Sequence, residues 1–165
     1  MVDSRDGQFY TTKQYGSKCW MTQNLNYATS GICYAGNASN CTIYGRLYGY
    51  STVNTTSVCP SGWHVPDLTE WMALNNLYGT GCLANGSWNC NPAGTALKVG
   101  GVSGFNALLG GILAGSSYSS IGTGGYYWVL SNYLEMFYTS YTTVAVSYLS
   151  TSANLYYLSV RCVKN

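Results

Sequence analysis

The stretch Cys59-Pro60-Ser61-Gly62-Trp63-His64-Val65-Pro66-Asp67-Leu68-Thr69-Glu70-Trp71 decides how the surrounding chain is organised. Pro60 and Gly62 favour a turn, and the ring of Pro66 disfavours helical backbone at the residue before it. The predicted order of elements in this stretch is therefore a turn, an extended segment and the start of a helix.

The helix is predicted to begin directly after Asp67. This residue is a favourable N-cap, and Glu70 three positions later completes the capping-box pattern. Apolar residues then recur at three- and four-residue spacings, which predicts one buried stripe. The stripe consists of Leu68, Trp71, Met72, Leu74 and Leu77. We expect the helix to end near Tyr78-Gly79-Thr80-Gly81, with glycine in the left-handed C-cap conformation.

Charged side chains are scarce throughout this chain of 165 residues. Asp, Glu, Lys and Arg make up 7% of it, against about 25% in an ordinary soluble domain. No run of about 18 apolar residues occurs, so direct insertion into a membrane is not expected. The formal net charge is +2 without a basic cluster, which argues against a nucleic-acid partner. We expect a single domain over residues 1–165 with a neutral polar surface.

Seven cysteines in so short a chain indicate an oxidising compartment. Cys33 and Cys41 bracket one small polar loop, Cys82 and Cys90 bracket another, and a disulfide could staple each loop. A zinc site would need a Cys-x-x-Cys spacing or nearby histidines, and His64 is the only histidine. Disulfides are therefore favoured over metal, and neither a metal site nor a cofactor is predicted.

The composition changes from Gly110 onward, where Tyr, Ser, Thr and Gly predominate. Three runs rich in β-forming residues, 126–130, 136–149 and 155–163, are predicted strands of an antiparallel sheet. Between Val99 and Val160 the only charged side chain is Glu135. The C-terminal third is therefore expected to be an uncharged, aromatic sheet.

Cys162 lies in the last of these runs on the same predicted face as Leu158 and Val160, which places it inside. Its natural partner is Cys59, and such a bridge would close a loop of about a hundred residues, worth about 4 to 5 kcal/mol in the loop-entropy model. Cys19 is then unpaired. A buried free thiol is favoured there over a nucleophile, because no base is evident beside it.

Several motifs occur in an order that resembles the Fibrobacter succinogenes major paralogous domain family. They are Asp6-Gly7-Gln8-x-Tyr10, Cys19-Trp20-Met21-x-x-Asn24-Leu25, Tyr44-Gly45-Arg46-Leu47-Tyr48, Cys59-Pro60-Ser61-Gly62-Trp63-His64-Val65-Pro66, Glu70-Trp71, Gly104-Phe105-x-Ala107-Leu108 and Ser159-Val160-Arg161-Cys162-Val163. The resemblance implies a C-type-lectin-like fold, related to formylglycine-generating enzymes and found on exported bacterial lipoproteins, pilin-like proteins and adhesins. It also implies the bridge between Cys59 and Cys162.

The predicted fold class is α+β, with small twisted antiparallel sheets, one or two helices, many loops and disulfide staples. A framework is expected over about residues 6–110 and a variable-looking ligand-contact segment over about 116–158. Members of the fold group also serve as variable proteins of diversity-generating retroelements, which are hypermutated at adenines. Where the family usually has a Trp-Ser-Ser-like run, Trp128 is here followed by Val129-Leu130-Ser131. The residues that fill the segment are those that adenine substitution in Asn-type codons would yield.

We expect a non-enzymatic recognition or adhesion domain, outside the cell or on its surface, that binds a protein or glycan ligand on another cell or surface. Its leader or anchor is expected to be absent from this chain. Tyr offers large, rigid contact area at low entropic cost, and Ser, Gly and Asn offer adaptable hydrogen bonds. The predicted ligand-binding residues are Tyr118, Tyr126, Tyr133, Tyr138, Tyr141, Tyr148, Asn154 and Tyr156. About half of the tyrosines are expected to be exposed, because strands alternate their faces.

Three other functions remain open at this point. An enzyme of the formylglycine-generating type would need an active-site cysteine pair, and each pair here is better used as a staple. A calcium-dependent sugar site would need clustered carboxylates, and the five acids are scattered. A structural subunit of a surface fibre or pilus would stack through neutral, Tyr-rich faces.

Overall fold

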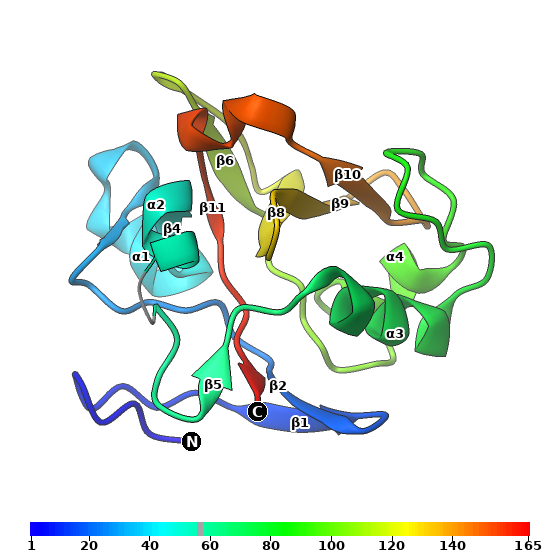
Figure 1. The fold of residues 1–165 in the computed structure, drawn as a ribbon, viewed down its shortest axis with the longest axis horizontal. Helices are drawn as coiled ribbons and strands as arrows, with labels where there is room; N and C mark the ends of the chain where they lie inside the picture. Colours follow the sequence, from blue (N-terminus) through cyan, green and yellow to red (C-terminus); the bar gives the residue numbers. More distant parts are fainter. Residues whose placement is uncertain (56–57) are drawn as a thin grey trace.

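Two β-sheets and four short α-helices form the described part of the chain, which belongs to the α+β class as predicted (Figure 1). The structure is a computed structural model that describes residues 1–55 and 58–165, and leaves the side chains of 55 and 150–152 undescribed. The helices are α1 (Ala38–Tyr44), α2 (Tyr50–Thr55), α3 (Leu68–Tyr78) and α4 (Ala93–Leu97), with 3₁₀ segments η1 (Tyr34–Gly36) and η2 (Ser150–Leu155). The prediction of one or two helices is wrong, because helices other than α3 are too short to show a periodicity. No described helix combines the length and the apolar character that crossing a bilayer requires.

The smaller sheet brings both ends of the chain beside the turn that precedes α3. Its order is β1-β2-β12-β5, and its pairings are antiparallel. The strands are β1 (Thr12–Tyr15), β2 (Lys18–Met21), β5 (Trp63–His64) and β12 (Val163–Lys164). Val163 lies opposite Trp20 on one side and His64 on the other. In Figure 1 this sheet runs along the lower edge, where both termini are marked.

The larger sheet has the order β10-β9-β8-β6-β11-β4-β3, and β7 pairs with β6. Its strands are β3 (Gly31–Ile32), β4 (Leu47–Gly49), β6 (Gly110–Ala114), β7 (Ser117–Ile121), β8 (Gly124–Val129), β9 (Tyr133–Tyr138), β10 (Ala145–Tyr148) and β11 (Tyr156–Ser159). Most pairings are antiparallel, but β8 contacts β6 and β11 in parallel. The predicted run 136–149 proves to span two antiparallel strands, β9 and β10, because the chain turns back between them.

β8 separates two hydrophobic cores, which explains why all six of its residues are buried. Tyr126 and Trp128 belong to the core that also includes residues of α2 and η2. Tyr127 and Val129 belong to the core that includes residues of α3 and α4. A strand that is covered on both faces reads as a continuous apolar run rather than an alternating one.

α3 begins as predicted. The side chain of Asp67 accepts a hydrogen bond from the backbone N–H of Glu70 at 2.8 Å, and the backbone N–H of Asp67 donates to the Glu70 carboxylate at 3.1 Å. The capping box is therefore complete.

The buried face of α3 differs in part from the predicted stripe. Trp71 and Leu74 are buried, but Leu77 is 51% exposed. Asn75 is fully buried, and the hydrogen bond that its amide donates to Glu135 of β9 at 3.0 Å compensates in part for the loss of water. The predicted stripe contained only apolar residues, so it could not include a buried polar residue that pairs with a strand.

Gly79 ends α3 with extended backbone, at φ −153°, so the predicted left-handed C-cap is wrong at this residue. A Cβ atom at Gly79 would lie 2.9 Å from Cys90 Sγ and 3.0 Å from Cβ of Ala93. Glycine is therefore needed for the close approach of the following loop and α4.

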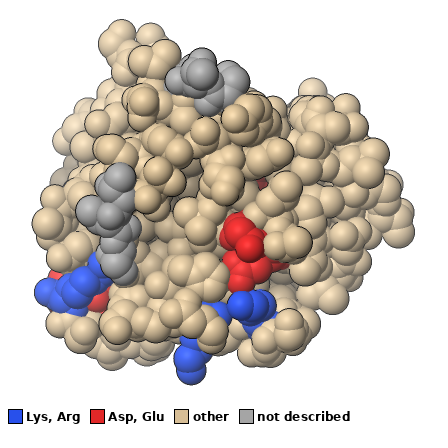
Figure 2. Space-filling view, viewed as in Figure 1, with Lys and Arg blue, Asp and Glu red and all other residues tan. Residues whose placement is uncertain are grey.

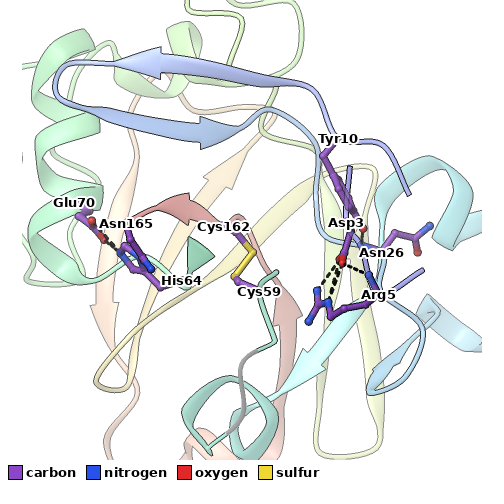
Figure 3. The surroundings of a disulfide bond; sticks show 9 residues. All are labelled: Asp3, Arg5, Tyr10, Asn26, Cys59, His64, Glu70, Cys162 and Asn165. Carbon is purple, nitrogen blue, oxygen red and sulfur yellow. Dashed lines mark hydrogen bonds and ion pairs between the residues drawn. A yellow bond between two sulfur atoms is a disulfide. The ribbon is translucent and has the colours of Figure 1, made fainter. Parts of the chain in front are cut away.

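The three predicted disulfides, Cys33–Cys41, Cys82–Cys90 and Cys59–Cys162, are present. The last joins the stretch before α3 to the segment before β12, with its Cα atoms 5.8 Å apart (Figure 3). Cys19 is free, as predicted. Its side chain is half-buried rather than fully buried, and it lies opposite the exposed Gln14 of β1.

Candidate functional site

Four aromatic residues, Trp88, Tyr126, Tyr138 and Tyr141, form what we call the aromatic cluster. The ring centroid of Trp88 lies 5.3 Å from that of Tyr138 and 4.6 Å from that of Tyr141. Tyr138 also contacts the rings of Tyr126 and Tyr141, at 5.7 and 6.0 Å. The hydroxyls of Tyr126 and Tyr138 are hydrogen-bonded to each other. Tyr141 is 46% exposed, so the cluster reaches the surface through this ring.

Trp88 reaches the cluster from the loop between Cys82 and Cys90. The N–H of Gly86 in this loop donates to the carbonyl of Val146 in β10 at 2.8 Å. Cys90 forms an isolated antiparallel bridge with Val144, just before β10. The loop therefore attaches at two points along the edge of the larger sheet and holds Trp88 against tyrosines of β9 and the turn after it.

Lys98 holds the turn between β9 and β10. Its Nζ donates to the backbone carbonyls of Tyr138, Thr139 and Tyr141 at 2.6, 3.2 and 2.7 Å. Burial lowers the pKa of this ammonium group. Three carbonyl acceptors match its three donors, so Lys98 has no donor left for a ligand.

An open groove of about 600 Å³ adjoins the same turn. Thr139 and Lys98 line it together with the apolar side chains of Val99, Val102 and Leu109. Val99 is 59% exposed and Val102 is 91% exposed. The turn after β9 thus contributes Thr139 to the groove and Tyr141 to the aromatic cluster.

Two further aromatic pairs lie elsewhere on the larger sheet. Tyr133 packs on Tyr148 at 5.1 Å, at the opposite end of β9 from Tyr138. Because residues five positions apart on a strand point to opposite faces, Tyr133 and Tyr138 cannot share one contact surface. Tyr118 of β7 packs on Tyr34 of η1 at 4.9 Å. The structure therefore divides the predicted tyrosines among several places rather than gathering them.

The predicted ligand-binding residues differ in exposure. Tyr118, Tyr141 and Tyr148 are 37%, 46% and 57% exposed, Asn154 is exposed, and Tyr133, Tyr138 and Tyr156 are half-buried. Tyr126 is only 7% exposed, so its inclusion as a contact residue needs correction. Its ring lies on a covered face of β8, in the core that includes residues of η2.

Charge is missing from the surface of residues 99–160. Glu135, the only charged residue in this segment, is fully buried. Its burial raises the pKa of the carboxyl well above the usual range, although the Asn75 hydrogen bond opposes this. Figure 2 shows acidic side chains near the centre of this view and basic side chains in its lower part, with no charged side chain visible toward the top.

His64 belongs to a polar network at the start of α3. Its Nε2 lies 2.9 Å from one carboxylate oxygen of Glu70, and Lys18 Nζ lies 2.9 Å from the other oxygen. Nδ1 of His64 contacts the side chain of Asn165, close to the Cys59–Cys162 bridge in Figure 3. Within residues 1–55 and 58–165, no three His, Cys, Asp or Glu side chains gather in a way that could hold a metal ion.

These features define an α+β domain with three disulfides, in which residues 99–160 expose no charged side chain. The profile of the Fibrobacter succinogenes major domain matches residues 14–164. The chain therefore belongs to this family, as its motifs predict. Comparisons with curated proteins and with solved structures found no match.

Trp88, Tyr34 and Lys98 are site residues that the sequence reasoning missed. Trp88 and Tyr34 each lie between two paired cysteines, and this tethering is a signal that could have found them. Lys98 has no such signal, because its acceptors are backbone carbonyls 40 to 43 residues away along the chain.

Proposed function

We propose that this chain is a recognition domain that binds a protein or glycan ligand, without catalysis, at an uncharged surface centred on the aromatic cluster. The observation that carries the proposal is a prearranged group of rings. Three of them belong to residues 99–160, which expose no charge, and the fourth, Trp88, packs on Tyr138 and Tyr141. Aromatic rings flanked by Ser, Thr, Gly and Asn resemble the composition of antibody paratopes. Stacking and neutral hydrogen bonds would then provide the affinity.

The cysteine arrangement supports a non-catalytic role. Six cysteines are consumed by disulfides, and Cys19 stands alone. A formylglycine-generating type of chemistry, which depends on an active-site cysteine pair, therefore has no pair to use. The same disulfides are compatible with an oxidising, extracellular setting. Together with the α+β class and the many loops, they support the assignment of a C-type-lectin-like fold.

We further propose that the segment 116–158 varies among related copies, as in proteins diversified by retroelements. The cysteine-closed loops and both cores hold this segment in place, while Tyr118, Tyr141 and Tyr148 are accessible for exchange. A downstream DNA repeat that differs from the coding sequence only at adenines, beside a reverse transcriptase gene, would support this idea. An identical segment in all genomic copies would contradict it.

Binding can be tested with two defined probe sets, an oligosaccharide array and a displayed library of random peptides. We expect at least one set to yield a ligand. For that ligand the double variant Trp88→Ala/Tyr141→Ala should raise Kd by at least about tenfold, since single aromatic anchors often cost more than 1 kcal/mol. The matched control is Val2→Ala/Phe9→Ala. Val2 is 61% exposed and Phe9 is 62% exposed, so this variant also removes exposed apolar surface, but at residues far from the cluster in the sequence.

A ligand whose Kd is unchanged by the Trp88/Tyr141 variant would exclude the aromatic cluster as the contact surface. Failure of both probe sets would count against recognition. If the domain instead forms filaments that the same variant abolishes, the surface serves assembly of a fibre. Analytical ultracentrifugation and electron microscopy distinguish that outcome.

A further inference from the structure

Glu135 and Asn75 form a buried polar pair between β9 and α3, and each has one oxygen without a partner. Asn75 Nδ2 donates to Glu135 Oε1 at 3.0 Å. Glu135 Oε2 and Asn75 Oδ1 are buried and make no hydrogen bond with any described residue. Both residues are 0% exposed. If the carboxylate were ionised, two buried acceptors would remain without a donor, which is costly.

The strands beside Glu135 bring no charge to it. Tyr127 lies opposite on β8 and donates its hydroxyl to the carbonyl of Leu108, and Val146 lies opposite on β10. Tyr133, two residues away on β9, shares its face. No basic side chain is therefore provided by β8, β9 or β10 to stabilise an ionised carboxylate.

The helix side and the core also lack a counter-ion. On α3, Tyr78 lies three residues after Asn75 and packs on the ring of Tyr15. The sulfur of Cys90, which lies near the Asn75 carbonyl, belongs to a disulfide. The buried guanidinium of Arg161 stacks over the ring of Tyr127, but it donates to an amide and to backbone carbonyls. Among the described residues, Glu135 therefore forms no ion pair.

We propose that Glu135 and Asn75 form a proton-dependent latch, in which neutral Glu135 donates from Oε2 to Asn75 Oδ1. With the existing bond from Nδ2 to Oε1, this second bond closes a two-bond ring between a carboxylic acid and an amide. The proton gives both Glu135 Oε2 and Asn75 Oδ1 a hydrogen-bond partner, and the resulting bond links α3 to β9. Loss of the proton to solvent opens the ring and leaves a buried, unpaired carboxylate.

The direction of the pH effect follows from the raised pKa of Glu135, whose first cause is burial. An unfolded chain releases the Glu proton near its ordinary pKa of about 4.3. Above that pH the folded chain still holds the proton, so the unfolded state is favoured increasingly as pH rises towards the folded pKa. The latch stabilises the fold fully in acid and loses its contribution in alkali.

The first test compares Tm against pH for the wild type and Glu135→Gln. The glutamine side chain of this variant keeps the shape of the acid and can donate to Asn75 Oδ1 at every pH. We expect the wild type to lose at least about 4 °C between about pH 5 and pH 9, and Glu135→Gln to lose less than half of that. Asp6→Asn, the same change at an exposed carboxyl, should keep the wild-type slope. Equal slopes in the wild type and Glu135→Gln would overturn the proposal.

The second test exchanges the two partners. In Glu135→Gln/Asn75→Asp the lengths of the side chains are unchanged, but the acid now lies on α3 and the amide on β9. The ring predicts that this swap restores the pH dependence that Glu135→Gln alone has lost, with a Tm in acid within about 3 °C of the wild type. If the swapped protein folds but its Tm is independent of pH, the ring does not exist.

An infrared measurement keeps the proposal falsifiable even if a variant folds poorly. The wild type at neutral pH should show the C=O stretch of a protonated, hydrogen-bonded carboxyl, which disappears in Glu135→Gln and fades as pH is raised. Absence of this band from the folded wild type at neutral pH would overturn the proposal.

Discussion

Arg161 is a buried cation whose partners are carbonyl oxygens rather than a carboxylate. It is 0% exposed, and burial lowers its pKa. Its guanidinium donates to Asn24 Oδ1 at 2.7 Å and to the carbonyls of Met21, Phe105 and Asn106 at 3.2, 2.7 and 2.5 Å. It also stacks over the Phe105 ring. Three segments that carry the family motifs therefore meet at one side chain, whose planar fork serves several acceptors at once.

We expect Arg161→Met to lower the free energy of unfolding by about 3 to 5 kcal/mol, because several buried acceptors lose their donor at about 1 to 3 kcal/mol each, partly offset by relaxation. Urea denaturation followed by circular dichroism measures the change. Lys164→Met, at an exposed position of β12, should stay within about 0.5 kcal/mol of the wild type. A loss below about 1 kcal/mol for Arg161→Met would show that the carbonyls find other donors.

At the scale of elements, the start of α3 rests on the Asp67–Glu70 capping box. We expect Asp67→Ala to cost about 1 kcal/mol near neutral pH. Burial opposes ionisation of Asp67, but hydrogen bonds from the Thr69 side chain and the backbone of Glu70 outweigh it and lower the pKa. Because the folded pKa is lowered, the stabilisation is present above the unfolded pKa of about 3.9 and is lost as pH falls through the folded pKa.

The measurement for this cap is the difference in unfolding free energy between the wild type and Asp67→Ala at neutral and at strongly acidic pH. The difference should shrink in acid. Ser61→Ala, in the exposed turn before α3, provides a control with little expected effect. A difference that grows in acid would contradict the sign of the shift.

The turn between β9 and β10 depends on one side chain from the end of α4. We expect Lys98→Met to speed hydrogen exchange of the Tyr141 amide by about tenfold or more, because three charge-assisted bonds to the turn are lost. Lys13→Met, which removes a bond to the Ser103 carbonyl elsewhere, should leave Tyr141 unchanged. Unaltered exchange at Tyr141 in Lys98→Met would mean that the turn between β9 and β10 is stable without the hydrogen bonds from Lys98.

At the scale of the whole molecule, the disulfides differ in how much chain they close. Cys59 and Cys162 are 103 positions apart, whereas Cys33 and Cys41 are 8 apart. In the loop-entropy model we expect replacement of the long-range pair by serine to cost about 4 to 5 kcal/mol, against about 2 to 3 kcal/mol for the short pair. Guanidinium denaturation of the two double variants gives this order, and the reverse order would contradict the entropic account.

Elements with local signals were predictable, and elements defined by distant partners were not. The start of α3 and the two short disulfides follow from residues close in sequence and from cysteine spacing. The long-range bridge between Cys59 and Cys162 was predicted from the inward face of Cys162 and from the family motifs. β6 and β7 were missed, because glycines interrupt the one and serines dominate the other. The burial of Tyr126 could not be predicted, since alternation within β8 is hidden when both faces are covered.

By itself, the sequence determined the family and, through the family motifs, the α+β class. It also indicated the two short disulfides and the scarcity of charge in the C-terminal third, because composition and cysteine spacing are local properties of the chain. Only the tertiary structure decided which tyrosines reach the surface, that Trp88 joins Tyr138 and Tyr141, that Lys98 fixes their turn, and that Glu135 lies buried against Asn75. Each of these depends on which face of a strand another segment covers. That is settled by packing between residues far apart in the chain.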